Sequence, residues 1–251
     1  MAPLNFLENC FRYARTSLFG RRSVRLRNRS PLISFSFDDF PRSALYVGGE
    51  ILEKYGASAT YYTALGLMNT DGPVGRIFSV ADLPEVLQRG HELGCHTFDH
   101  CDTWTTHPET YERSIVRNRE ELHRLLPGAT FSTFSYPLSI PRPETKRRIE
   151  KHFQCGRSCF QTFNSRRADL NLVRAFFLEQ CKGDVAQAKA VIDRNAQSRG
   201  WLVFATHDIS VTPTRFGCTP KFFEEVVRYA VESRAKLLPV AKAVEAIYGL
   251  Q

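Results

Sequence analysis

The stretch Leu32-Ile33-Ser34-Phe35-Ser36-Phe37-Asp38-Asp39 joins a strand-like run to two adjacent acids. Side chains alternate along a strand, so the two serines share a face with Asp38 and the phenylalanines share the other face. The phenylalanine face suits contact with helices, which leaves Asp38 pointing toward the mouth of a barrel. Asp39 joins it there only if the chain bends, and the nearby Pro41 favours a bend.

Two histidine groups follow strand-like runs in the same way. His96-Thr97-Phe98-Asp99-His100 ends one run, and His207 follows Trp201–Thr206. The carboxyl ends of parallel strands form the active site in α/β folds, and two histidines with a carboxylate are ligands of a catalytic zinc-type site. On a helical turn, the four-residue spacing would place His96 and His100 on one side. Each group alone also fits a solvated turn or a structural histidine, but the three together predict a metal-dependent hydrolase.

Strand-like and helical patterns alternate along the chain, which predicts a parallel sheet. The expected strands are residues 32–37, 59–63, 92–96, 131–135, 172–178, 201–206 and 236–240. The expected helices are residues 43–56, 82–89, 108–126, 143–152, 184–199 and 220–233, and residues 155–169 fit neither pattern. We therefore expect an α/β fold, a closed or nearly closed (β/α) barrel of seven or eight parallel strands, rather than an open doubly wound sheet. A nucleotide site has no support, because no Gly-rich phosphate motif follows the first strand.

The positive charge is concentrated at the N-terminus. Residues 1–30 hold seven arginines and one glutamate, hence +6 of the formal net charge of +8. We predict a basic N-terminal arm over residues 1–30 and a catalytic domain over residues 31–251, with no nucleic acid as partner. Leu4, Leu7, Phe11, Ala14 and Leu18 recur at helical spacing. That helix either packs on the body or touches an anionic membrane surface, and we expect the arm to be dispensable for chemistry.

The seven cysteines are scattered and odd in number, so they predict no disulfide framework. Cys95, which directly precedes His96, is expected to face the core. Reduced thiols, the lack of a signal-peptide pattern and the lack of an apolar run of about 18 residues indicate a cytoplasmic protein.

The segments SFDDF, HTFDH and FATHD, at residues 36–40, 96–100 and 204–208, resemble in order and spacing the motifs of the NodB-homology polysaccharide deacetylases, carbohydrate esterase family 4. The resemblance covers about residues 31–240. It implies a distorted (β/α) barrel of the NodB-homology type that removes N- or O-acetyl groups with one divalent metal. Zinc is the expected ion, with Co²⁺ or another divalent ion as the alternative.

The resemblance also implies roles for individual residues. It makes Asp38 the general base, His207 the general acid, and Asp39, His96 and His100 the metal ligands. Leu138 stands where the family has an aromatic residue whose backbone N–H stabilises the oxyanion. Ser135 stands in place of the family's base-orienting arginine; the candidates to replace that arginine are Arg42 and Arg174, and those for the carboxylate partner of His207 are Glu179 and Asp184.

Three functions remain open from the sequence. The first is removal of acetyl groups from N-acetylated sugars or glycans, and the second is hydrolysis of another non-peptide C–N bond in a small linear or cyclic amide. The third is a non-catalytic, metal-containing module that binds glycan. The complete set of acids and histidines favours the enzymes over the third.

Overall fold

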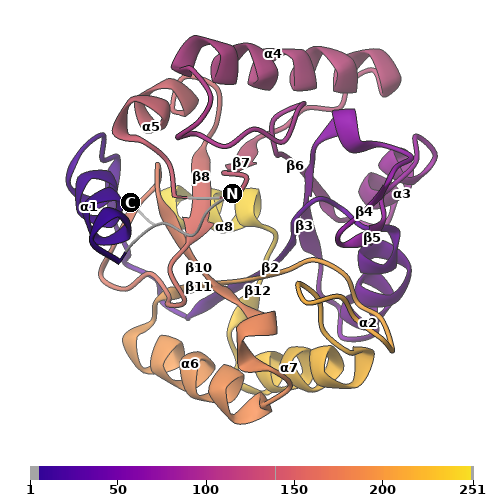
Figure 1. The fold of residues 1–251 in the computed structure, drawn as a ribbon. Helices are drawn as coiled ribbons and strands as arrows, with labels where there is room; N and C mark the ends of the chain where they lie inside the picture. Colours follow the sequence, from indigo (N-terminus) through magenta and orange to yellow (C-terminus); the bar gives the residue numbers. More distant parts are fainter. Residues whose placement is uncertain (1–5, 139, 250–251) are drawn as a thin grey trace.

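The computed structural model describes residues 6–138 and 140–249 and has a closed parallel barrel at its centre (Figure 1). In this part of the chain, seven strands run in the order β2, β3, β6, β7, β8, β10 and β11, and pairing of β11 with β2 closes the ring. A short strand, β12, adds to β2. The expectation of a (β/α) barrel is confirmed. The strand bounds are β2 (Leu32–Phe37), β3 (Ala59–Thr63), β6 (Glu92–Cys95), β7 (Thr133–Ser135), β8 (Cys155–Cys159), β10 (Val173–Phe177), β11 (Trp201–Thr206) and β12 (Lys236–Leu237).

Helices surround the barrel (Figure 1). They are α1 (Phe6–Leu18), α2 (Glu50–Lys54), α3 (Asp82–Gln88), α4 (Pro108–Leu125), α5 (Pro143–Ile149), α6 (Val185–Ser198), α7 (Pro220–Glu232) and α8 (Val240–Gly249), with a π-helix η1 (Ala44–Gly49) and two 3₁₀ turns, η2 (Leu65–Leu67) and η3 (Leu178–Cys181). Two strand pairs lie outside the barrel, β1 (Ser23–Arg25) with β9 (Arg167–Asp169) and β4 (Asp71–Gly72) with β5 (Gly75–Arg76). None of the helices in the described residues is long and apolar enough to cross a membrane.

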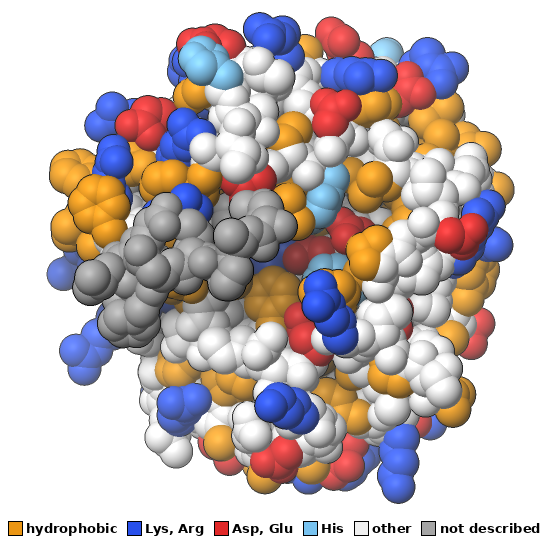
Figure 2. Space-filling model, viewed as in Figure 1, with side chains coloured by type: hydrophobic (Ala, Val, Ile, Leu, Met, Phe, Trp, Pro, Cys, Tyr) orange, Lys and Arg blue, Asp and Glu red, His pale blue; other side chains and the backbone are white. Residues whose placement is uncertain are grey.

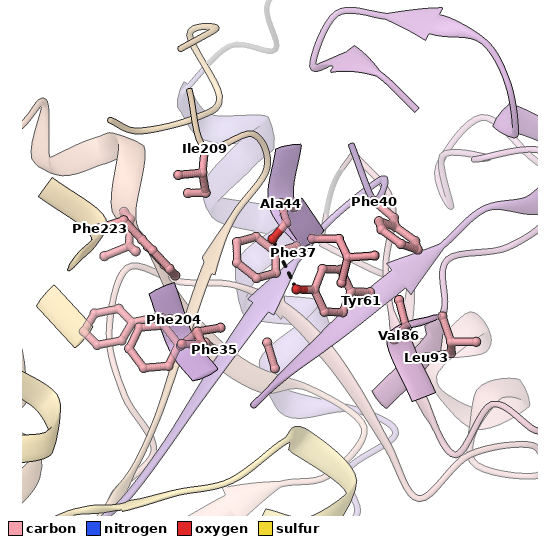
Figure 3. Close-up of a cluster of buried hydrophobic side chains, with 14 of the residues drawn as sticks. Phe35, Phe37, Phe40, Ala44, Tyr61, Val86, Leu93, Phe204, Ile209 and Phe223 are labelled. Carbon is pink, nitrogen blue, oxygen red and sulfur yellow. Dashed lines mark hydrogen bonds between the residues drawn. The ribbon is translucent and has the colours of Figure 1, made fainter. Parts of the chain in front are cut away.

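The two faces of β2 are used as the alternation predicts. Phe35 and Phe37 lie under α7, with ring centroids 5.6 and 5.7 Å from that of Phe223 (Figure 3). On the other face, Ser34 accepts a hydrogen bond of 3.0 Å from the indole of Trp201. The outer aromatic layer anchors the strand, so the residues that follow Phe37 emerge at a fixed place on the carboxyl end of the barrel.

The expected strand over residues 236–240 is wrong in its second half. β12 ends at Leu237, and Pro239 introduces α8. The N–H of Val240 donates to Thr60 Oγ1 and that of Ala241 to Glu92 Oε2, both at 2.9 Å. Thr60 and Glu92 lie at the amino ends of their strands, so α8 covers the end of the barrel opposite the histidine groups.

The predicted helix over residues 43–56 is interrupted. A π-helix, η1, precedes α2, and Ser43 makes no capping bond; its hydroxyl accepts from the N–H of Ile209 at 3.3 Å. A side chain at Gly48 would lie 2.9 Å from the ring of Phe37. Glycine therefore allows the wide turn to approach the barrel closely.

The N-terminal arm is packed on the body of the protein. β1 pairs antiparallel with β9, and the buried ammonium of Lys146 donates to the carbonyls of Thr16 and Phe19 at 2.7 and 2.9 Å. The same group forms an ion pair of 2.8 Å with Asp169. Such contacts join the arm to the body of the protein, and the dispensability of the arm for chemistry stays a prediction. Of the residues at helical spacing, Leu4 lies outside the described residues.

Candidate active site

Two residues in the left-handed region turn the chain after β2. Asp39 has φ +60° and Phe40 has φ +51°, and the N–H of Asp38 still donates to Thr206 of β11 at 3.0 Å. The bend therefore begins directly after Asp38, ahead of Pro41. Left-handed backbone at a phenylalanine is strained and persists only where the surroundings enforce it. As a result, Asp38 and Asp39 both lie, largely buried, at the mouth of the barrel.

The two histidines of HTFDH lie on a loop after β6 rather than on a helical turn. Thr97 and His100 have φ values of +57° and +51°. Ser114 of α4 holds the loop, because its hydroxyl accepts from the N–H groups of Phe98 and Asp99 at 3.1 and 3.0 Å. The ring centroids of His96 and His100 lie 5.0 Å apart. The spacing thus brings them together by a different geometry from the helical one.

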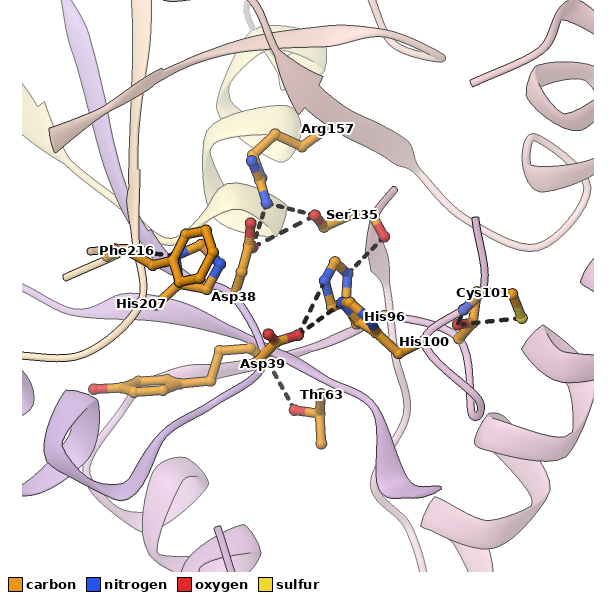
Figure 4. Close-up of polar contacts among 12 residues, drawn as sticks. Asp38, Asp39, Thr63, His96, His100, Cys101, Ser135, Arg157, His207 and Phe216 are labelled. Carbon is orange, nitrogen blue, oxygen red and sulfur yellow. Dashed lines mark hydrogen bonds and ion pairs between the residues drawn. The ribbon is translucent and has the colours of Figure 1, made fainter. Parts of the chain in front are cut away.

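Asp39, His96 and His100 form a cluster with ligand atoms within 4.8 Å of one another (Figure 4). Asp39 Oδ1 lies 3.0 Å from His100 Nε2 and 3.5 Å from His96 Nε2, yet it is buried without hydrogen-bond geometry to any described residue. His96 Nδ1 lies 2.8 Å from the carbonyl of Ser135, an acceptor that fixes the proton on Nδ1 and leaves the Nε2 lone pair for a ligand. The donor set fits a divalent cation such as zinc.

Ionisation states agree with a cation site. Burial lowers the pKa of His96 to about 4, so its ring is neutral near pH 7. Burial opposes ionisation of Asp39 and protonation of His100, but their mutual contact outweighs it, lowering the pKa of Asp39 and raising that of His100. A bound cation would replace the proton that this pair holds.

Asp38 is paired with a residue that sequence reasoning missed, Arg157 of β8. The guanidinium donates to Asp38 Oδ1 and to the hydroxyl of Ser135, and that hydroxyl lies 3.4 Å from the same carboxylate oxygen (Figure 4). Burial alone would raise the pKa of Asp38, but the charge of Arg157, with lesser contributions from His96 and His207, outweighs burial and holds that pKa below its ordinary value. Asp38 is therefore a carboxylate at neutral pH.

The two arginines that the sequence proposed for this role are elsewhere, and that prediction is wrong. Arg42 forms an ion pair of 3.0 Å with Asp82, and the exposed Arg174 lies over the ring of Phe160 at 5.6 Å. Residues 155–169 fit neither a strand nor a helix pattern, so the sequence does not indicate that Arg157 points toward the site. Once β8 is assigned, alternation places Arg157 and Cys159 on one face, and both line the pocket described below.

His207 emerges at the end of β11 between two aromatic rings. Its ring centroid lies 5.5 Å from that of Phe216 and 6.4 Å from that of Phe177, and Nδ1 lies 3.2 Å from the carbonyl of Phe216. A backbone carbonyl therefore occupies the place expected for a carboxylate partner, leaving Nε2 for the pocket.

Neither carboxylate proposed as the partner of His207 takes that part. Asp184 caps α6, accepting from the N–H of Ala186 at 3.0 Å. Glu179 does line the pocket, but burial raises its pKa to about 8, which leaves it mainly protonated at neutral pH.

The proposed residues line one pocket of about 510 Å³ at the carboxyl end of the barrel. Figure 2 shows acidic and histidine surfaces at the bottom of a hollow near the centre of this face. Leu138 stands on its wall, 68% exposed, with a left-handed backbone at φ +64°. The remaining wall is rich in aromatic side chains, namely Tyr13, Tyr136, Phe160, Phe177 and Phe216. A polar floor of acids and histidines below an aromatic rim is suited to hydrolysis of a group carried on a ring-shaped substrate.

The chain is similar to known proteins in its sequence profile and in its fold. The sequence profile described as polysaccharide deacetylase matches residues 26–154, just over half of the chain. Similar solved structures include peptidoglycan deacetylase PdaC from Bacillus subtilis (15% identity, 88% of this chain and 93% of that one, TM-score 0.56). A family 4 acetyl xylan esterase from Clostridium thermocellum with a cobalt ion (16%, 87% and 91%, 0.58) and a CE4 family pseudoenzyme from Bacillus anthracis (11%, 88% and 68%, 0.61) are also similar. These structural likenesses establish the fold, and no curated protein sequence matches the chain.

Proposed function

This chain belongs to the polysaccharide deacetylase family, and on that premise we propose that it is a metal-dependent hydrolase that removes acetyl groups from N-acetylated sugars or glycans. The observation that carries the proposal is the pairing of two adjacent acids with different partners. Asp39 faces His96 and His100, while Asp38 faces Arg157. One acid is thus placed to bind a cation and the other to move a proton.

We propose Asp39, His96 and His100 as ligands of one divalent ion, zinc or, as in the similar xylan esterase, cobalt. When bound, such an ion polarises the acyl carbonyl and makes water more acidic. Asp38, ionised beside Arg157, would accept the proton of the attacking water. The backbone N–H of Leu138 would donate to the oxygen that becomes negative, a contribution typically worth about 10²–10³ in rate.

His207 is proposed as the general acid. Its Nδ1 is held by the carbonyl of Phe216, so Nε2 can carry a proton to the departing amine. An amine is a poor leaving group without that proton, which is why the role matters for amides. Proton transfer of this kind typically contributes about 10²–10⁴ in rate.

The other functions differ in what the pocket must recognise. Hydrolysis of a small linear or cyclic amide would use the same groups, but the aromatic wall around the pocket favours a sugar ring. A non-catalytic glycan-binding role is the third candidate, because one protein of similar fold is a pseudoenzyme. The presence of Asp38, Asp39 and the three histidines together argues against it.

Acetate release tests the proposal. Metal-depleted protein is reloaded with Zn²⁺ or Co²⁺ and incubated with N-acetylglucosamine oligomers, acetylated xylan and cyclic imides. Acetate from the N-acetylated oligomers, restored by metal, is expected. Ring opening of the imides without acetate release would favour the second function, and stoichiometric metal without any hydrolysis would favour the third.

Substitution of His207 by alanine should affect substrates according to their leaving groups. We expect deacetylation of an N-acetyl sugar to fall about 10²-fold more than hydrolysis of nitrophenyl acetate, because a nitrophenolate leaves without a proton. The measurement is kcat/KM of wild type and variant on both substrates. Equal losses on both, with a lowered melting temperature, would show that His207 only supports the strand end.

We further propose that the basic arm contacts an anionic surface. Arg25 of β1 lies directly opposite Arg167 of β9, and like charges in that position are destabilising unless something else compensates them. No described carboxylate forms an ion pair with either arginine. Sedimentation with vesicles of phosphatidylglycerol, but not of phosphatidylcholine, is expected and should weaken in Arg25→Gln/Arg167→Gln. Unchanged sedimentation of that variant would contradict the proposal.

The six described free cysteines, Cys95 among the buried ones, fit a reducing compartment. A cytoplasmic location is therefore part of the proposal. In that location, soluble oligosaccharides or small N-acetylated sugars are more accessible substrates than a finished cell wall.

A further inference from the structure

The arm contributes a side chain to the pocket. Tyr13 of α1 lines the same cavity as Asp38 and His207, and its ring meets that of Phe160 edge to face, with centroids 5.3 Å apart. The residue is 39% exposed, so part of its surface is open to a ligand. Burial and the neighbouring Cys159 raise the pKa of Tyr13 to about 12, which keeps the hydroxyl neutral.

Helix α1 is fixed in this position by contacts of its second half. The hydroxyl of Thr16 donates to the carbonyl of Pro141 at 2.5 Å, and Arg12 lies over the ring of Trp104 at 4.4 Å. The ammonium of Lys146 in α5 donates hydrogen bonds to the carbonyls of Thr16 and Phe19. The helix is therefore tied to the segment that follows Leu138, and these contacts position Tyr13 in the wall of the pocket.

The walls beside the reacting groups are aromatic. Tyr13 and Phe160 come from α1 and the end of β8, while Phe177 and Phe216 flank His207. The C–H faces of a pyranose ring pack well on aromatic faces, and the electron-rich face of the ring favours such contacts. An acetyl group alone is too small to fill a pocket of about 510 Å³.

We propose that α1 is a wall of the substrate site and that Tyr13 packs against a sugar ring, so that the N-terminal helix sets the affinity for carbohydrate. The inference rests on the proposed function, since it places the sugar that carries the acetyl group. It makes Tyr13 a specificity-determining residue for sugars, and it makes the arm part of the catalytic unit.

Measuring sugar binding to an inactive variant tests this inference independently of catalysis. The Asp38→Asn protein, loaded with zinc, is titrated calorimetrically with N-acetylglucosamine oligomers of two to six units. Adding Tyr13→Ala should raise Kd about 2- to 12-fold, the range given by loss of one aromatic contact, whereas Tyr13→Phe should leave it unchanged. Leu18→Ala is the matched control, because Leu18 is 66% exposed on the same helix and is not part of the pocket lining.

Turnover gives the second readout. In an otherwise wild-type chain, Tyr13→Ala should raise KM for the oligomer by a similar factor, with a smaller change in kcat. An unchanged Kd in Tyr13→Ala, an equal effect of Leu18→Ala, or no oligomer binding at all overturns the inference. Oligomer binding that depends on Tyr13, without acetate release by wild type, overturns the proposed function and leaves the inference standing.

Discussion

Asp38→Asn should keep its metal and lose turnover, with kcat lower by about 10²–10⁴-fold. The substitution removes the proton acceptor but leaves the cluster of Asp39, His96 and His100 intact. Asp39→Asn should instead lose its metal, and lose turnover as a consequence. The substitution removes the charge of the only carboxylate in that described cluster. Metal content by elemental analysis and kcat on an N-acetylglucosamine oligomer are measured on both proteins.

Folding is the control for this comparison. Asparagine at residue 38 leaves the buried guanidinium of Arg157 without its counter-charge, and breaking a buried pair costs about 3–5 kcal/mol. Thermal melts must therefore show a folded protein at the assay temperature. Near-normal kcat in folded Asp38→Asn would remove Asp38 from the mechanism. Equal metal loss in both variants would mean that the two acids share the cation.

Regular strands could be read from the sequence because their burial leaves a clear pattern. The expected bounds of β2, β3 and β11 coincide with those observed. Each of these strands is buried at every residue, and a buried strand reads as a near-continuous apolar or alternating run. The two helices beginning at Pro108 and Pro220 were predicted for a similar reason, since proline suits the first helical turn.

β8 could not be recognised by the same pattern. Cys155-Gly156-Arg157-Ser158-Cys159 contains a glycine, a serine and a charge, yet four of its five residues are buried. The buried charge of Arg157 is neutralised by a partner far away in the chain, the carboxylate of Asp38. A charge that is neutralised only by the tertiary fold gives no local signal, so the residue most closely tied to the proposed base was absent from the sequence prediction.

The geometry of the site depends on backbone states that composition does not specify. Asp39, Phe40, Thr97 and His100 all have positive φ values, although only aspartate and histidine are moderately tolerant of them. The motif resemblance named three residues, Asp39, His96 and His100, that the structure brings together. It did not predict that the histidines would meet through a loop held by Ser114, because that contact comes from α4.

Arg157→Ser should abolish most turnover, and adding Ser135→Arg should restore part of it. Ser135 and Arg157 lie on adjacent strands, β7 and β8, at directly paired positions, and both contact the same oxygen of Asp38. Exchanging the two residues keeps one cation beside that oxygen and returns the arginine to the position implied by the family motif. We expect roughly a 10²-fold fall in kcat for the single variant and at least a tenfold recovery in the exchange.

The pH profile supplies a readout that a merely structural role would not move. Arg157 holds the pKa of Asp38 below its ordinary value against the effect of burial. Without the guanidinium, burial raises that pKa, so the acidic limb of kcat/KM should shift to higher pH in Arg157→Ser and return in the exchange. Ser135→Arg alone should melt at the lowest temperature, because it buries two cations beside one carboxylate. The contrary outcome is a doubly substituted protein, Arg157→Ser/Ser135→Arg, that is folded yet no more active than Arg157→Ser. It would show that Arg157 stabilises the barrel and does not set the ionisation of Asp38.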